Sequence, residues 1–264
     1  MSETPDPVAD TRNTLFASGL MSESYVYVKK KLAKDPENID LMALAGQTAY
    51  EYEKTKNPIL RTHWCDRLDL LHEALETTHR CMEKDPDALQ CARYFVLLAV
   101  KAADMQFFIK ELNNLGVMHN WHRIHARGEE LLEKNFFPDV ALALAGMHGR
   151  VARRWYNPFR FLQRYVYGIP TEDELYSKAI ELHTKVLEHD PENMENVCRL
   201  GQVCLLKGDD AAARKWFSKV RNEMVQREKN DQIWAAIANT ALVGRFPVHD
   251  KGIKKSHKWR LPLG

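Results

Sequence analysis

The sequence has no apolar run long enough to cross a membrane. None of its 264 residues belongs to a stretch approaching the roughly 20 consecutive apolar residues that a membrane-spanning helix needs. Residues 1–13 are acidic and contain no apolar segment, so they are not expected to form a signal peptide or a transit peptide. We therefore expect a cytoplasmic protein without a transmembrane segment.

The sequence also lacks paired cysteine motifs and a large net charge. Five cysteines occur, and none forms a C-x-x-C pair: Cys65, Cys81, Cys91, Cys198 and Cys204. An odd count without such pairs predicts reduced thiols in the interior of a cytosolic protein. The net charge is +2, which is too small to indicate binding to nucleic acid. No nucleic-acid partner is therefore expected.

The common catalytic motifs are missing as well. The sequence contains no nucleophile elbow, no glycine-rich phosphate loop and no H-E-x-x-H motif. His119, His122 and His125 stand three apart, and two imidazoles at that spacing can bind a metal, but no Asp, Glu or Cys lies between them. We expect structural or surface roles for these histidines. The prediction is a protein without catalytic residues, cofactor or metal, and hence not an enzyme.

What the sequence does contain is a helix hairpin over residues 190–221. Leu200, Gly201 and Cys204 lie on one face of its first helix, and Ala213 and Phe217 lie four apart on its second. This spacing matches the tetratricopeptide signature of a Leu-Gly pair followed by Ala-x3-Phe. Because glycine and alanine are small, the two helix axes can approach closely while the phenylalanine ring fills the space beside them.

An Asp-Pro dipeptide repeats along the chain, and we call each copy an Asp-Pro mark. Asp-Pro occurs at 35–36, 85–86 and 190–191, with Pro138 as a looser copy, and the prolines are 50, 52 and 53 residues apart. Proline is favoured just inside a helix start, and the preceding Asp can cap the exposed amides. Each mark is therefore expected to end one helix and open the next. An internal repeat of this length indicates a solenoid of stacked helix hairpins.

Small residues recur at fixed distances from these marks. We predict that they and their large neighbours form the close helix contacts of the repeat: Gly46, Ala74, Ala126, Gly146, Ala179, Leu200, Gly201, Ala213 and Phe217. The interval between paired helices is 12 residues from Gly201 to Ala213, but 28 from Gly46 to Ala74. The earlier repeats are therefore expected to have long first helices, extended connections, or both.

The predicted fold is all-α, a right-handed tetratricopeptide-like solenoid of antiparallel helix pairs with long inter-helix insertions. Residues 1–13 are predicted to be a disordered acidic tail, 14–244 the helical repeat domain, and 245–264 a basic C-terminal tail. The segment from Ala88 to Ala103 is apolar nearly all round, which predicts a buried central helix. Thr171-x-x-Glu174 predicts a capping box.

Two segments combine cations with apolar residues. An insertion at residues 153–167 is aromatic and basic, and its candidate contacts with a membrane, a lipid or neighbouring hairpins are Arg153, Arg154, Trp155, Arg160 and Arg164. The C-terminal tail is locally +5. Its candidate contacts with an acidic surface are Lys251, Lys254, Lys255, Lys258 and Arg260. A solvated tail, or one folded back through Trp259 and Leu261, is the alternative.

Several motifs together resemble a known family. The small-residue run at 144–146 and Gly149-Arg150-Val151-Ala152 precede the aromatic-basic insertion. Pro170-Thr171-Glu172-Asp173, Ala179-Ile180-Glu181 and a closing Gly-Asp-x-x-x-Ala-Arg hairpin follow it. From Leu15 to Val243, the chain resembles the tetratricopeptide-like domain of the regulator of microtubule dynamics family. The resemblance implies an all-helical domain without catalytic residues, association with microtubules or spindle poles, and in some members a lipid-binding concave surface at organelle contacts.

The functional expectation is a non-enzymatic binding scaffold that acts through the concave groove of a helical repeat. If the resemblance holds, the scaffold is associated with microtubules or the spindle in the cytoplasm, and tubulin is a candidate partner. The alternative is a module that binds or transfers lipids or apolar ligands at organelle membranes, with a phospholipid or an anionic membrane surface as its partner. The sequence does not specify which side chains line the groove.

Overall fold

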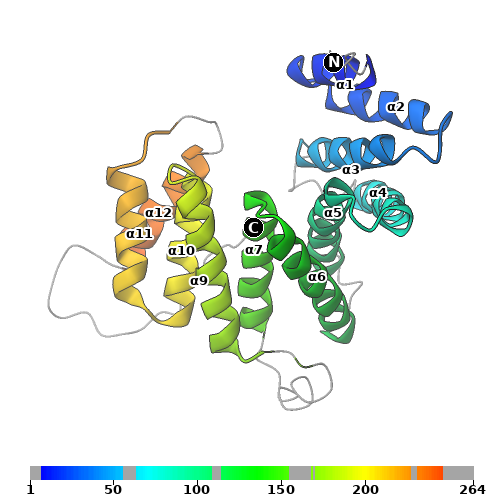
Figure 1. Ribbon diagram of the computed structural model, residues 1–264. Helices are drawn as coiled ribbons and strands as arrows, with labels where there is room; N and C mark the ends of the chain where they lie inside the picture. Colours follow the sequence, from blue (N-terminus) through cyan, green and yellow to red (C-terminus); the bar gives the residue numbers. More distant parts are fainter. Residues whose placement is uncertain are drawn as a thin grey trace, which may run out of the picture. The chain divides into compact units, whose positions relative to one another are not determined.

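The computed structural model describes residues 7–55, 64–108, 114–154, 168, 170–226 and 231–245. The described residues form helices and no strands, which confirms the all-α prediction for this part of the chain (Figure 1). The helices are α1 (Pro7–Ala17), α2 (Met21–Leu32), α3 (Ile39–Lys54), α4 (Trp64–Lys84), α5 (Leu89–Phe108), α6 (Asn114–Lys134), α7 (Pro138–Arg154), α9 (Glu172–His189), α10 (Met194–Lys207), α11 (Asp210–Asn222) and α12 (Asp231–Arg245). No described helix combines the length and apolarity that crossing a bilayer requires.

The chain divides into two compact units, Met1–Ala143 and Leu144–Gly264, and each is described by itself. In the first unit α1 begins at Pro7, so residues 7–13 are helical rather than part of a disordered tail. The three lysines 29–31 close α2, as expected from the attraction between cations and the negative end of a helix.

The Asp-Pro marks do separate helices, but the capping residue differs from the prediction. At the first mark, the side-chain oxygen of Asn38 accepts a hydrogen bond from the backbone N–H of Leu41 (3.0 Å), and the carboxylate of Asp35 accepts one from the Asn38 amide (3.0 Å). Asn193 and Asp190 repeat this arrangement before α10. Proline thus lies in a turn ahead of the helix, where its fixed φ suits the second turn position, and the asparagine caps the helix.

Two other helix ends follow from local chemistry. Thr171 and Glu174 form the predicted capping box at the start of α9, with reciprocal side-chain to backbone hydrogen bonds. Gly208 ends α10 with φ +91°, a left-handed conformation that glycine adopts without steric cost. Asp209 then caps α11 by accepting a hydrogen bond from the backbone N–H of Ala212 (2.9 Å). The hairpin of α10 and α11 therefore turns sharply.

The first unit is built around α5. This helix contacts α3, α4 and α6, and its residues are buried over most of their circumference, which confirms the predicted central helix. α3 approaches closely because Gly46 has no side chain. A Cβ added there would lie 2.5 Å from Thr78 Cγ2 and 3.2 Å from Tyr94 Cβ, so only glycine fits between α4 and α5 at this point.

A buried ion pair also joins the helices of the first unit. The carboxylate of Glu53 is 1% exposed and accepts a hydrogen bond from Arg67 Nε of α4 (3.0 Å) and a second from the same guanidinium. Lys101 Nζ of α5 lies 3.7 Å from the other carboxylate oxygen. Since an unpaired buried charge is costly, this pair fixes α4 and α5 relative to α3.

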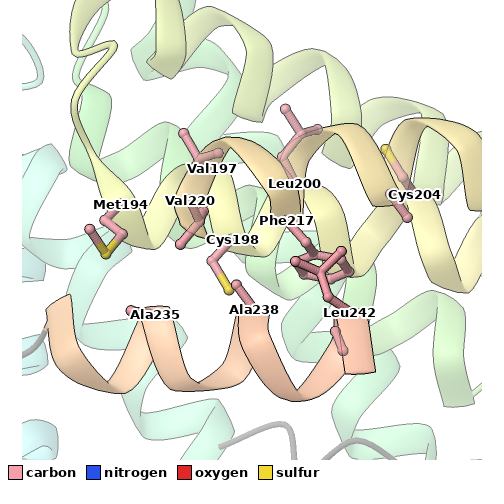
Figure 2. Packing of buried hydrophobic residues seen from close by; sticks show 12 residues of the cluster. Met194, Val197, Cys198, Leu200, Cys204, Phe217, Val220, Ala235, Ala238 and Leu242 are labelled. Atoms are coloured by element: carbon pink, nitrogen blue, oxygen red, sulfur yellow. The ribbon is translucent and has the colours of Figure 1, made fainter. Parts of the chain in front are cut away.

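The second unit has its main core around α10. Its buried apolar residues come from α10, α11 and α12 (Figure 2): Met194, Val197, Cys198, Leu200, Cys204, Ala213, Phe217, Val220, Ala235, Ala238, Ala241 and Leu242. Phe217 is fully buried, and burial of such a side chain stabilises a fold by about 1.5–3 kcal/mol. The core therefore depends on the Ala213 and Phe217 spacing that the sequence contains.

The four cysteines whose side chains are described form two groups, and one group differs from the prediction; the side chain of Cys65 lies outside the described residues. Cys81 at the end of α4 and Cys91 at the start of α5 form a disulfide, with Cα atoms 6.2 Å apart. The prediction of reduced thiols is therefore wrong for this pair, because the turn between α4 and α5 brings together two cysteines that are ten residues apart. Cys198 and Cys204 are free and buried, and burial raises the pKa of the Cys198 thiol to about 12.

Candidate binding groove

A hollow of about 740 Å³ lies on the first unit, with α5 between α4 and α6. Its apolar lining comes from all three helices: Leu75, Met82, Phe95, Ala99, Ala102, Ala103 and Ile124. Its polar and charged lining comes from α4 and α6: His72, Glu76, His79, Glu83, Arg123, Arg127 and Glu130. Ala126 of α6 completes it. We call this hollow the α4–α6 groove.

The floor of the groove is supplied by α5. Phe95, Ala99, Ala102 and Ala103 recur at intervals of four, three and one residue, so they share one side of the helix. Three of these four side chains are single methyl groups, which leaves space between the flanking helices. The opposite side of α5 is held in the core, where Val96, Leu97 and Leu98 are buried. The floor is therefore apolar, consists mainly of small side chains, and lies on a helix whose other side is buried in the core.

The α4 wall results from the amphipathic pattern of that helix. Leu68, Leu71 and Ala74 are buried against α3 and α5, which turns His72, Glu76, His79 and Glu83 toward the groove. The ring of His79 lies 6.0 Å from the ring of Phe95 on the floor. Its Nδ1 lies 3.6 Å from a carboxylate oxygen of Glu83. This wall is therefore acidic, with two imidazoles.

The α6 wall has the opposite character. Ile124 and Leu131 are buried and anchor the helix, while Arg123 and Arg127 line the groove. Arg127 donates a hydrogen bond to a carboxylate oxygen of Glu130 (2.6 Å), and this bond holds the pKa of Glu130 below its usual range. The second guanidinium nitrogen of Arg127 points across the groove to the sulfur of Met82 (3.9 Å). Two arginines on one wall thus face two glutamates on the other.

The residues predicted to form the close helix contacts lie in different environments. Ala74, Ala179, Leu200, Ala213 and Phe217 are buried. A Cβ added at Gly201 would lie 2.9 Å from the Phe217 ring, whereas one added at Gly146 would meet mainly the Arg150 guanidinium (3.2 Å). Ala126 is exposed and lines the groove rather than a helix contact.

Other predicted sites fall outside the described residues. Arg153 and Arg154 are the last residues of α7, but their side chains, together with Trp155, Arg160 and Arg164, lie outside the described part of the chain. The same holds for the tail residues Lys251, Lys254, Lys255, Lys258 and Arg260. Their roles stay predictions.

Of the histidine series, His122 and His125 belong to no metal site within the described residues, and the side chain of His119 lies outside them. His122 is exposed, and His125 packs its ring 4.8 Å from the ring of Trp121. The Nε2 atom of His125 lies 4.0 Å from a carboxylate oxygen of Glu129. In the part of the chain that the structure describes, no group of three His, Cys, Asp or Glu side chains is placed to hold a metal ion.

Sequence reasoning missed the groove because its residues are spread over three helices and are mostly small or polar. The stripe of Leu71, His72 and Leu75 on α4 was visible in the sequence. Which of its edges faces a neighbouring helix depends on the packing of α5, which the sequence does not specify. No protein-family model matches this chain, and a comparison with curated proteins finds no significant match.

Proposed function

We propose that this chain is a non-enzymatic binding scaffold that receives an amphipathic segment of a partner protein in the α4–α6 groove. The observation that carries the proposal is an apolar floor between two charged walls, in a hollow of about 740 Å³. A helix laid into such a groove buries its apolar stripe on the floor and keeps its polar residues beside the walls. The groove favours a segment with acidic residues beside Arg123 and basic residues beside Glu76.

We further propose that the helix pairs of each unit stack as in a right-handed tetratricopeptide-like solenoid. In such a stack, the first helix of a pair contacts its own partner and the first helix of the next pair. The contacts support this: α3 contacts both α4 and α5, and α10 contacts both α11 and α12.

The cellular setting that we propose is the cytoplasm, in association with microtubules or the spindle. This part of the proposal rests on the resemblance to the regulator of microtubule dynamics family over Leu15–Val243. Tubulin and spindle proteins are the candidate partners, either through the groove or through another surface of the chain.

Proximity labelling in living cells tests the groove directly. The key variant is Ala126→Trp, which places an indole in the groove from an exposed position and so leaves the core unchanged. Ala236→Trp makes the same exchange at an exposed position of α12 and is the matched control. We expect tubulin and spindle proteins to be labelled by the native chain and the control, and to be lost from Ala126→Trp. Equal labelling by all three chains would overturn the assignment of the groove.

A second candidate occupant is a lipid or another apolar ligand, and the apolar floor is the observation that favours it. Native mass spectrometry and organic extraction of the purified chain distinguish the two. If a lipid is recovered from the native chain but not from Ala126→Trp, the occupant of the groove is a lipid rather than a peptide. Empty protein, with no uptake from vesicles, is the result expected for a peptide groove.

A further inference from the structure

We propose that the outer face of α11 is a docking surface for an acidic, glutamate-rich segment of a protein partner. The cationic side chains of this face are Lys215, Lys219 and Arg221, with Arg214 beside them. The surface belongs to the second unit, and the inference does not depend on the α4–α6 groove.

The two faces of α11 are sharply divided. Ala213, Phe217 and Val220 are buried in the core of the second unit (Figure 2), which leaves the cations on the other side of the helix. The acidic residues of the hairpin lie at the start of α11, where Asp209 caps the helix by accepting a hydrogen bond from the backbone N–H of Ala212. From residue 214 to residue 221 every ionisable side chain is a Lys or an Arg.

Three of the cations are not neutralised by a carboxylate within the described residues. Lys215, Lys219 and Arg221 form no ion pair with a carboxylate in that part of the chain; Arg221 donates instead to the side-chain oxygen of its neighbour Asn222 (3.1 Å). Neighbouring helices differ, because Lys178 and Lys185 of α9 both pair with Glu181. The charge of these three side chains is therefore available to a partner.

Trp216 orders two of the cations. Its ring is partly buried against the core of the second unit, and the ammonium groups of Lys215 and Lys219 lie 5.2 Å and 6.0 Å from its centroid. An aromatic face attracts a cation at such distances. The lysines are thereby held over a fixed ring, which reduces the conformational freedom that they lose on binding.

The spacing of the cations suits an extended acidic peptide. Lys215 and Lys219 are four residues apart in a helix, which corresponds to a rise of about 6 Å. Alternate side chains of an extended peptide point the same way and are about 6.6 Å apart. Carboxylates at every second position of the peptide can therefore contact Lys215 and Lys219 in turn, while Arg221, two residues after Lys219, contributes its charge from the other edge of the face.

The surface is a poorer match for a membrane. A helix that lies on a bilayer inserts its apolar face into the lipid, but the apolar face of α11 is already buried in the core. The exposed and half-buried residues on the outer side, such as Ala211 and Ser218, are small, and the one large side chain beside the cations, Trp216, packs against the core.

Fluorescence anisotropy with a labelled peptide of alternating glutamate and serine tests the proposal. The full chain is compared with a variant carrying Lys215→Gln, Lys219→Gln and Arg221→Gln. The matched control carries Lys30→Gln, Lys34→Gln and Arg80→Gln, which removes the same charge from exposed positions of the first unit. All three chains carry the tail change of Lys251, Lys254, Lys255 and Lys258 to Gln, so that tail charge does not mask the effect.

We expect the α11 variant to bind the peptide about tenfold more weakly, since each exposed charge contact contributes modestly. The control should bind like the parent, and binding should weaken steeply with salt. Equal affinity of the two variants would overturn the proposal. The proposal would also be overturned if the peptide does not bind and the same lysines instead bind phosphatidylserine vesicles or a single-stranded oligonucleotide. Thermal melting of each chain checks that the variants are folded.

Discussion

Gly201 is in contact with the ring that fills the core of the second unit. A Cβ at this position would lie 2.9 Å from Cε1 of Phe217, which is fully buried and has no space to move. We predict that Gly201→Ala destabilises the chain, because overpacking costs about 1–3 kcal/mol and outweighs the better helix propensity of alanine, about 1 kcal/mol. Gly149→Ala is the matched control, since its Cβ would meet Val203 at an ordinary 3.7 Å, and it should stabilise. Chemical denaturation measures both, and equal shifts of the same sign would contradict the close contact.

His183 makes the stability of the second unit depend on pH. It is fully buried, its Nδ1 lies 2.7 Å from the side-chain oxygen of Asn196, and its Nε2 has no hydrogen-bond partner in the described part of the chain. The Asn196 amide donates to the backbone oxygen of His183 (2.9 Å), so its oxygen accepts the Nδ1 proton. A proton added to Nε2 would be buried without a partner, and burial accordingly lowers the pKa of His183 to about 4.

The direction of the pH effect follows from this pKa. The unfolded chain takes up a proton at His183 below about pH 6.5, whereas the folded chain does so only near pH 4. The contribution of His183 is therefore fully present above pH 6.5 and is lost as the pH falls toward 4, on the order of 3 kcal/mol in total. We predict that His183→Gln loses less unfolding free energy than the native chain between neutral pH and about pH 5. An identical loss in both chains would rule this out.

At the residue scale, the sequence predicted apolar contacts within a hairpin better than it predicted polar ones. Gly201, Ala213 and Phe217 meet because helical spacing alone places them on facing sides of adjacent helices. Glu53 and Arg67 form a buried ion pair across 14 residues, part of which lies in the connection between α3 and α4. No periodic pattern marks such a pair, since charged residues at other positions of the same helices are solvated.

Among the helices, the start of α5 lacks a cap that its counterparts possess. The Asp-Pro turns before α3, α5 and α10 share a hydrogen bond from the fourth residue to the backbone oxygen of Asp, as in Ala88 to Asp85 (3.1 Å). Two of them place asparagine at the fourth position, Asn38 and Asn193, whereas the third places Ala88 there. We predict that Ala88→Asn stabilises the chain by about 1 kcal/mol and that Asn193→Ala destabilises it by a similar amount. Thermal unfolding of both variants measures this, and a destabilising Ala88→Asn would show that the turns are not equivalent.

Element boundaries were predictable from the sequence where a turn residue has one dominant conformational preference. The Asp-Pro marks located the breaks before α3, α5 and α10, because proline cannot continue a preceding helix. The lengths of the helices were not predictable in the same way. The excess length of the early repeats is shared between their second helices, since α4 and α6 have 21 residues each and α11 has 13, and the predicted longer connection between α3 and α4. The length of a helix depends on how far its apolar stripe packs against neighbouring helices, and this packing is decided by the folded unit rather than by the local sequence.

For the molecule as a whole, the sequence predicted the class of structure but not which residues line the α4–α6 groove. The groove exists because α4 and α6 flank the small residues of α5. This arrangement depends on how the three helices pack. The sequence of each helix alone indicates only an ordinary amphipathic or buried helix. The division of the chain at Ala143 also falls inside α7, where no change of composition marks it.

The distribution of charge along the chain leads to the last prediction. Residues 245–264 carry a net charge of +5 in a chain that totals +2, so the remainder is acidic overall. An acidic surface should attract this segment, and the acidic tails of tubulin are the surface that fits the family resemblance. We predict that the full chain co-sediments with microtubules at low salt. A chain that ends at Gly244, or one with Lys251, Lys254, Lys255 and Lys258 changed to Gln, should pellet less.

The attraction should weaken as salt increases, because the Debye length falls from about 10 Å at 0.1 M to about 3 Å at 1 M. Phosphatidylserine vesicles provide the competing acidic surface, to which each basic residue near the membrane contributes on the order of 1 kcal/mol. If all three chains pellet equally with microtubules at low salt, the C-terminal segment has no part in the interaction. The insertion at residues 153–167 and the outer face of α11 would then be the next cationic segments to change, one at a time, in the same assay.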